Sequence, residues 1–160
     1  MSANPQAPAW SSHAHERLTS AGYRRGGARR AVIDLLNKQH CALSAAEIEE
    51  QLRDGTRGVG RASVYRVLEE LEELQLVTRV GVGDGIARFE AHHPEGRHHH
   101  HHLFCCECGD ILPFEDDELE RSIRRVSEKV GFEMTGHDIT LHGTCEGCAR
   151  SRRSSKRIVP

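Results

Sequence analysis

Metal-ligating side chains gather in the middle of this 160-residue chain. Five consecutive histidines, residues 98–102, shortly precede Cys105 and Cys108, which form a Cys-x-x-Cys pair, and a second pair, Cys145 and Cys148, lies near the C-terminus. Imidazole and thiolate ligands at this density favour a borderline-soft ion such as zinc over magnesium or calcium. A histidine expression tag is terminal, whereas this run is internal. The sequence therefore predicts metal binding.

The two cysteine pairs match a closed, tetrahedral structural zinc site, which leaves no position for a reacting water. Gly109 suits a tight turn directly after Cys108, which favours Cys105 over Cys106 as the first member of its pair. We interpret Cys106 as a free thiol pointing away from the metal. Cys41 is interpreted as a half-buried core cysteine, the commoner fate of a lone cysteine.

The histidine run is expected to be a strand, in which successive side chains alternate faces. His98, His100 and His102 would face one way, and His99 and His101 the other. One strand could thus supply two metal sites, back to back, each needing ligands from elsewhere. The further candidates are Glu90, His92 and His93 near a linker, Glu120 on a predicted helix, and His137 on the last predicted strand.

Overall charge excludes a global basic field, since the formal net charge is -2. Binding to nucleic acid would need a local basic surface. Such clusters occur at Arg24, Arg25, Arg29 and Arg30, and again over residues 150–157. The chain shows neither a signal-peptide core nor an apolar run of membrane-spanning length, so we expect a cytoplasmic protein. Its cysteines then indicate metal or redox chemistry rather than disulfides.

The first half of the sequence has the element order of a winged helix-turn-helix. Helices are predicted over residues 29–38, 44–52 and from about 61 to 74, and a hairpin over 76–80 and 86–90. Ser44 and Glu47 form a capping box at the start of the second helix. The third helix would enter the major groove. Its polar face carries Arg61, Ser63, Tyr65 and Arg66, whose hydroxyl and guanidinium groups suit phosphates and base edges.

The second half is predicted to be a small α/β dimerisation domain. Strands are expected over residues 98–104, 111–114 and 132–143, and a helix over 116–130. The fold class is therefore α+β. The expected division is a disordered arm (1–16), the winged-helix domain (17–90), a hinge (91–97), the metal-binding dimerisation domain (98–148) and a basic tail (149–160).

From about Leu18 to Cys148 the chain resembles the ferric uptake regulator family of metal-dependent repressors. The resemblance rests on Ala62-Ser-Val-Tyr65-Arg66-Val-Leu, on Arg88-Phe-Glu90, on the histidine run followed by Leu-Phe-Cys105-x-x-Cys108-Gly, and on Gly143-Thr-Cys145-x-x-Cys148. It implies an N-terminal winged helix and a C-terminal dimerisation domain. It also implies that the protein represses transcription as a metal-loaded homodimer.

The same resemblance implies roles for individual residues. Cys105, Cys108, Cys145 and Cys148 match the structural zinc ligands, Glu90, His100 and His102 a regulatory site at the hinge, and His99, His101, Glu120 and His137 an additional metal site. Tyr65 and Arg66 match DNA-contacting positions, to which we add Arg24, Arg61 and Ser63. Iron-type members place a histidine where Ala42 stands here. We therefore expect His92 to be the fourth hinge ligand, with His40 as the alternative.

The expected function is a metal-responsive repressor of metal homeostasis that binds palindromic double-stranded DNA operators. Its cofactors would be a structural Zn²⁺ and a second, regulatory Zn²⁺ or Fe²⁺. The histidine run resembles zinc-type members, whereas Arg88-Phe-Glu90 resembles iron-type ones. Neither a membrane nor a small organic substrate is expected as a partner. Enzymatic activity is not expected either, because a zinc hydrolase would need an H-E-x-x-H motif, or three ligands beside a general base, and the sequence shows neither. The alternative is a zinc-buffering or metallochaperone protein, which would leave the winged helix without a purpose.

Overall fold

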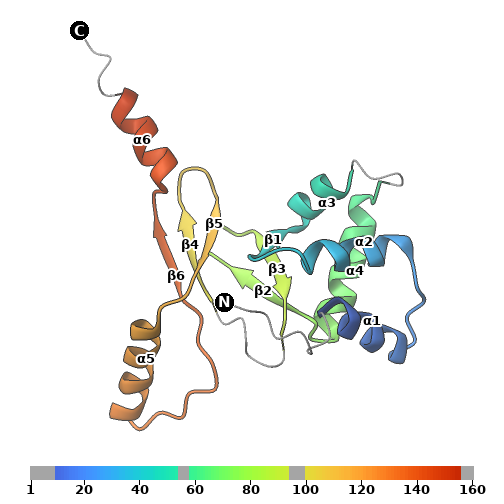
Figure 1. Cartoon of the computed structure of the whole chain (residues 1–160), viewed down its shortest axis with the longest axis horizontal. Helices are drawn as coiled ribbons and strands as arrows, with labels where there is room; N and C mark the ends of the chain where they lie inside the picture. The colour runs from blue at the N-terminus through green and yellow to red at the C-terminus, as the bar shows by residue number, and fades with distance from the viewer. Residues whose placement is uncertain (1–9, 54–57, 94–99, 156–160) are drawn as a thin grey trace. The chain divides into compact units, whose positions relative to one another are not determined.

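The chain forms two compact units, residues 1–97 and 98–160, in a computed structural model (Figure 1). The structure describes residues 10–53, 58–93 and 100–155, with side chains through Arg152. Both units combine helices with a small three-stranded sheet, so the fold is α+β, as the sequence predicted. No helix in these ranges is long and apolar enough to cross a membrane.

The first unit contains the predicted winged-helix elements and one more helix. In order they are α1 (Trp10–Ser20), α2 (Gly27–Leu36), β1 (Leu43–Ser44), α3 (Ala45–Arg53), α4 (Arg61–Glu73), β2 (Val77–Gly81) and β3 (Ala87–Ala91). The sheet order is β1-β3-β2, and both pairings are antiparallel. The hairpin strands each begin and end one residue later than predicted. The two-residue strand β1 is too short to be recognised from an alternating pattern.

Helix α1 contradicts the expected disordered arm through residue 16. Residues 10–16 form its first turns, whereas residues 1–9 lie outside the described residues. Trp10, Ala14 and Leu18 are buried, four residues apart on one face, and the Trp10 indole donates a hydrogen bond to the Leu76 carbonyl (3.0 Å). Three apolar residues at this spacing are enough to dock an otherwise polar helix.

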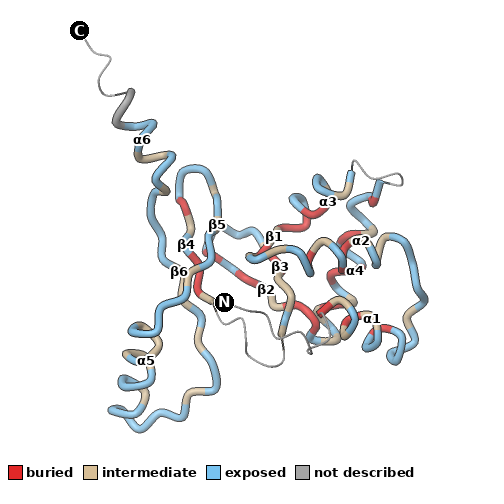
Figure 2. The backbone as a smooth tube through the Cα atoms, viewed as in Figure 1, coloured by how far each residue is buried: buried red, intermediate tan, exposed pale blue. Residues whose placement is uncertain are grey.

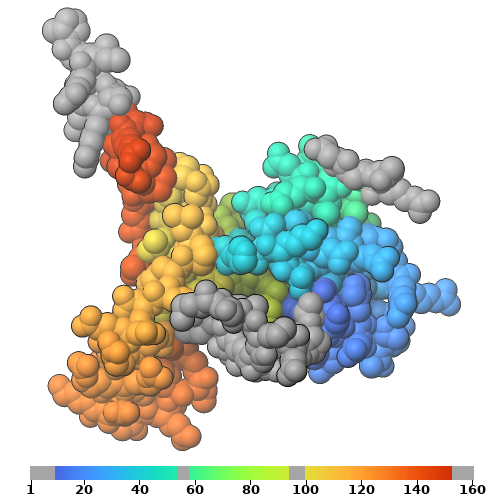
Figure 3. Space-filling view, in the orientation of Figure 1, coloured from blue at the N-terminus to red at the C-terminus, as the bar shows by residue number. Residues whose placement is uncertain are grey.

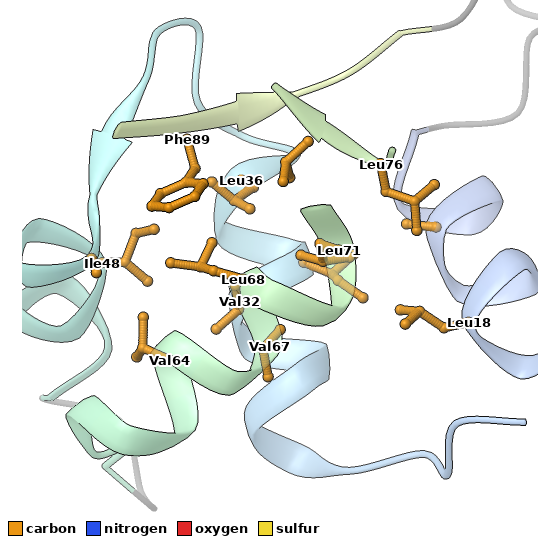
Figure 4. Packing of buried hydrophobic residues seen from close by; sticks show 14 of the residues in the cluster. Leu18, Val32, Leu36, Ile48, Val64, Val67, Leu68, Leu71, Leu76 and Phe89 are labelled. Atoms are coloured by element: carbon orange, nitrogen blue, oxygen red, sulfur yellow. The ribbon is translucent and has the colours of Figure 1, made fainter. Parts of the chain in front are cut away.

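The core of the first unit is built around α4. Val64, Val67, Leu68 and Leu71 are buried at the helical spacing that the sequence shows. Figure 4 shows these side chains facing Val32 and Leu36 of α2, Ile48 of α3 and Phe89 of β3. Complete burial of one such side chain contributes roughly 1.5–3 kcal/mol. The packed face of α4 thus fixes its opposite, polar face toward solvent.

Local hydrogen bonds position α3 and the β2–β3 hairpin. The predicted capping box is confirmed: the Ser44 amide donates to Glu47 Oε2 (2.7 Å) and the Glu47 amide to Ser44 Oγ (3.2 Å). In the hairpin turn, Asp84 accepts hydrogen bonds from Arg88 and from the Ile86 amide. The hydrogen bond from Arg88 lowers the pKa of Asp84 to about 2.

The second unit has β4 at the centre of its sheet. Its elements are β4 (His101–Cys105), β5 (Ile111–Phe114), α5 (Asp117–Lys129), β6 (Thr140–Gly143) and α6 (Glu146–Ser155). The order is β5-β4-β6, with β5 antiparallel and β6 parallel to β4. The predicted strand over 132–143 forms only at 140–143, where it pairs with His102 to Cys105 of β4. Helix α6 occupies part of the predicted basic tail.

Burial differs sharply between the units (Figure 2). In the described part of the second unit, the buried residues are His101, His102 and Cys105, and α5 buries none. Leu103 lies opposite Leu112 on one side and Leu141 on the other, and all three are exposed. The sheet of the second unit therefore presents an apolar row across all of its strands.

Candidate metal centres and reading helix

The four cysteines of the two pairs lie together in the second unit. The sulfur atoms of Cys105, Cys108, Cys145 and Cys148 are all within 4.8 Å of one another. Cys105 Sγ is 4.0 Å from Cys148 Sγ, and Cys108 Sγ is 3.8 Å from Cys145 Sγ. A tetrahedral zinc with Zn–S bonds of about 2.3 Å requires sulfurs about 3.8 Å apart. The geometry therefore fits a zinc ion.

Two short turns deliver these sulfurs, and we call them the cysteine turns (residues 105–108 and 145–148). β4 ends at Cys105, and Gly109 closes the first turn with a φ of 79° and a hydrogen bond from its amide to the Cys105 carbonyl (2.9 Å). The second turn runs into the first turn of α6. Cys106 is exposed and lies outside the cluster.

Hydrogen bonds within the cluster separate the pKa values of its thiols. Hydrogen bonds from the amides of Cys108 and Cys145 lower the pKa of Cys105 to about 6. The amide of Asp110 also lowers the pKa of Cys108, but the bond to Cys105 and burial outweigh it and raise that pKa to about 12. The bond to Cys145 raises the pKa of Cys148. One thiolate thus suppresses ionisation of its neighbours, and a bound divalent cation would reverse that suppression.

A second cluster lies at the opposite end of β4, where the strand begins at His101. His101 Nε2 is 2.8 Å from Glu120 Oε1, and His137 Nε2 is 3.1 Å from the same oxygen. Glu120 comes from the first turn of α5, and His137 from the chain between α5 and β6. His99, the fourth predicted member, lies outside the described residues. Two imidazoles and a carboxylate form a donor set suited to zinc or iron(II).

His100 and His102 lie on the opposite face of the strand from His101. Their rings are 5.0 Å apart in an edge-to-face arrangement, whereas His101 contacts His137 and Phe114. The side chains therefore alternate as the strand period requires. The other two predicted hinge ligands belong to the first unit. Glu90 on β3 lies opposite Thr78, whose hydroxyl oxygen is 3.2 Å from His92 Nδ1.

Helix α4 presents the predicted DNA-contacting residues of the first unit. Tyr65 is 48% exposed, Arg61 and Arg66 are exposed, and Ser63 is half-buried. Arg61 Nε bonds to Glu49 Oε2 at 2.9 Å, which partly neutralises its charge. The guanidinium of Arg66 and the phenol of Tyr65 lie on the side of α4 opposite its packed leucines and valines. These groups match the donors and acceptors of base edges and phosphates.

A basic cleft lies between the end of α1 and the start of α2. Its volume is about 440 Å³, and its lining includes Tyr23, Arg24, Arg25, Arg29 and Arg30. Arg29 bonds to Glu70 of α4 through two nitrogens (2.8 and 2.6 Å), so it ties α2 to α4. Arg24, Arg25 and Arg30 are exposed. The sequence analysis did not predict this ion pair, although the arginine cluster and the glutamates of α4 could have indicated it.

Comparison with known proteins identifies the family of this arrangement. The family described as "Ferric uptake regulator family" matches residues 20–142. A ferric uptake regulation protein of Bacillus subtilis (strain 168) is 34% identical over 134 residues, which cover 83% of this chain and 90% of that protein.

Two solved structures share the fold of most of this chain. The Vibrio cholerae ferric uptake regulator matches with a TM-score of 0.71 and 32% identity, covering 82% of this chain and 98% of that one. The Helicobacter pylori ferric uptake regulator, reported to have three functional metal binding sites, matches with a TM-score of 0.74 and 26% identity, covering 87% and 93%.

Proposed function

Because this chain belongs to the Ferric uptake regulator family, we propose that it is a metal-responsive transcriptional repressor that binds palindromic operators as a metal-loaded homodimer. Members of this family are regulators rather than enzymes. The observation that carries the proposal is β4 with the residue before it: His100 and His102 lie on one face, His101 lies on the other, and the strand ends in Cys105. The protein would control metal homeostasis in the cytoplasm.

The cysteine cluster would hold the structural Zn²⁺. A second ion, Zn²⁺ or Fe²⁺, would be held at the hinge by Glu90 and His92 of the first unit and by His100 and His102 of the second. Such an ion would favour one arrangement of the reading helices, because it binds that arrangement more tightly than any other. A dimer reads half-sites about one helical turn apart, so the spacing of its two reading helices decides whether both engage.

His92 is favoured as the fourth hinge ligand by its contact with Thr78. When Nδ1 donates to the Thr78 hydroxyl, Nε2 is left as the metal-binding nitrogen. The first unit offers two other candidates, exposed His40 and half-buried Cys41. Both precede β1, whose Leu43 lies opposite Phe89, the neighbour of Glu90. A thiolate at that position would favour zinc over iron(II).

The row formed by Leu103, Leu112 and Leu141 supports the homodimer. Exposed leucines that continue across three strands are costly in a monomer, and contact with a second copy would remove them from water. The exposed Tyr65 and Arg66 support DNA as the other partner. A zinc-buffering or metallochaperone role is not favoured, because it would not explain why the first unit folds so that Tyr65 and Arg66 are exposed.

Metal-dependent gel shift of a palindromic duplex tests the proposal. Replacing His100 and His102 by alanine should abolish the metal-triggered shift while one zinc per chain and the dimer remain. His142→Ala is the matched control, because this exposed histidine lies on neighbouring β6, outside both clusters. Single replacements of His92, His40 and Cys41 would then identify the fourth ligand. An unchanged shift in the double variant would contradict the hinge assignment.

A further inference from the structure

Three polar side chains outside the cysteine cluster connect both cysteine turns with α6. The Thr144 hydroxyl donates to Glu107 Oε1 (3.0 Å), and the Arg152 guanidinium donates to Thr144 Oγ1 (2.6 Å) and pairs with Glu107. We propose that Glu107, Thr144 and Arg152 are positioning residues that hold the two turns together and slow release of the metal between them. This inference rests on the proposed zinc site.

We call Glu107, Thr144 and Arg152 the bridge, and the location of each residue explains how the bridge can hold the two cysteine turns together. Glu107 lies inside the first cysteine turn, and Thr144 directly precedes the second, 37 residues further along the chain. Release of an ion from four sulfurs requires the two turns to move apart. The β4–β6 ladder ends at Cys105 and Gly143, so it restrains the turns from one side. The bridge spans the same gap from the solvent side, beyond the end of the ladder.

Helix α6 has few other attachments to the unit. It projects from the rest of the second unit in Figure 3 (red), and its residues through Arg152 are exposed or half-buried. Arg152 lies one helical turn beyond Cys148, a member of the cysteine cluster. Docking of Arg152 onto Glu107 and Thr144 therefore fixes the direction in which α6 carries Cys148. Loss of that docking would let the second turn swing with the helix.

The same helix contains a matched comparison. Arg150 pairs with Glu146, four residues earlier on α6, and its side chain is 74% exposed, against 61% for Arg152. The two arginines thus have the same helix, a similar exposure and an acidic partner. They differ in that the partner of Arg150 is local, so that pair cannot restrain one cysteine turn against the other.

The experiment measures zinc transfer from the full-length dimer to a chromophoric chelator. Variants are Arg152→Met, Thr144→Val and the control Arg150→Met, each first checked for one zinc per chain and for dimer mass. We expect release to be roughly threefold to tenfold faster in the first two and unchanged in the control. Replacing a residue that bonds directly to a metal ligand typically lowers metal affinity 10–100-fold. We expect a smaller effect here, because Glu107, Thr144 and Arg152 bond to one another on the exposed surface.

A second readout separates positioning from general loosening. Hydrogen exchange of the amides of residues 145–152 should accelerate in Arg152→Met, whereas the amides of β5 should not change. A double-variant cycle with Glu107→Gln should show that the two effects do not add, because both break one bridge. Equal release rates in Arg152→Met and Arg150→Met would overturn the inference. Wild-type protein without tightly bound zinc would instead overturn the zinc site on which it rests.

Discussion

The two units of this protein are stabilised in different ways. The first packs Leu68 and Leu71 of α4 against buried aliphatic side chains of other helices, including Ile33, Leu36 and Ile48. In the described part of the second, the buried side chains are two histidines and a cysteine, all on β4. A domain can fold on hydrophobic burial alone only if it buries enough of it. We infer that metals and a second copy supply in the second unit what the core supplies in the first.

The largest expected effect follows from removing a zinc ligand. Cys145→Ser should release the zinc, unfold the second unit and abolish the dimer, because binding to a structural thiolate site is coupled to folding. The first unit should persist. Zinc analysis, sedimentation and the fluorescence of Trp10, the single tryptophan, measure these three outcomes separately.

Cys106→Ser is the control, since its thiol is exposed and outside the cluster. It should keep the zinc and the dimer. Loss of both in this variant would show that the wrong cysteine has been assigned to the first turn.

Replacing a leucine is expected to destabilise the first unit but to leave the folding of the second unit less affected. Leu71 is fully buried, and Leu71→Ala should destabilise the first unit by roughly 2–5 kcal/mol. Leu112 is 50% exposed, so Leu112→Ala should leave that stability unchanged and instead weaken the dimer. Urea unfolding followed by Trp10 fluorescence and dilution-dependent sedimentation test the pair. A dimer unaffected by Leu112→Ala would argue against the leucine row as an interface.

A smaller effect is expected at the surface of α4. Arg66→Ala and Tyr65→Phe should each weaken operator binding by about 1–3 kcal/mol, the cost of one base-edge contact, without changing metal content or stability. Fluorescence anisotropy with a labelled duplex, at a fixed salt concentration, measures the change. Glu69→Ala, an exposed position further along α4, serves as the control. Unaltered affinity in both variants would remove α4 from the interface.

The smallest effect concerns the pH dependence of the hairpin. Since the folded-state pKa of Asp84 is lowered to about 2, its ion pair with Arg88 stabilises the folded state above the ordinary carboxyl pKa of about 4. That contribution is lost as the pH falls from about 4 through about 2. Asp84→Asn should therefore be less stable than the wild type at pH 6, and the difference should disappear near pH 2 in thermal melts. A difference independent of pH would contradict this.

Sequence patterns predicted most elements because their signals were local and periodic. The helical spacing of the apolar residues of α4 and the capping box of Ser44 and Glu47 are both patterns that can be recognised within a few residues of sequence. Helix α1 was missed because Trp10, Ala14 and Leu18 are separated by polar residues. Strand β6 was predicted too long because its length depends on β4, a tertiary constraint. The identity of the ions stays a prediction, because a donor set alone does not fix the metal that it binds. The fourth hinge ligand stays a prediction too, since the proposed hinge ligands come from separate units.

The dense spacing of ligands on strand β4 limits which mutations the gene can tolerate. Together with His100, which precedes it, the strand carries side chains directed to the proposed hinge, to the His101–Glu120–His137 cluster and to the cysteine cluster. Gain or loss of one codon there would shift His101 and Cys105 relative to each other and damage several centres in a single event. Substitutions can alter one centre at a time, but a change of length cannot. The spacing between these residues should therefore be among the slowest features of the gene to diverge.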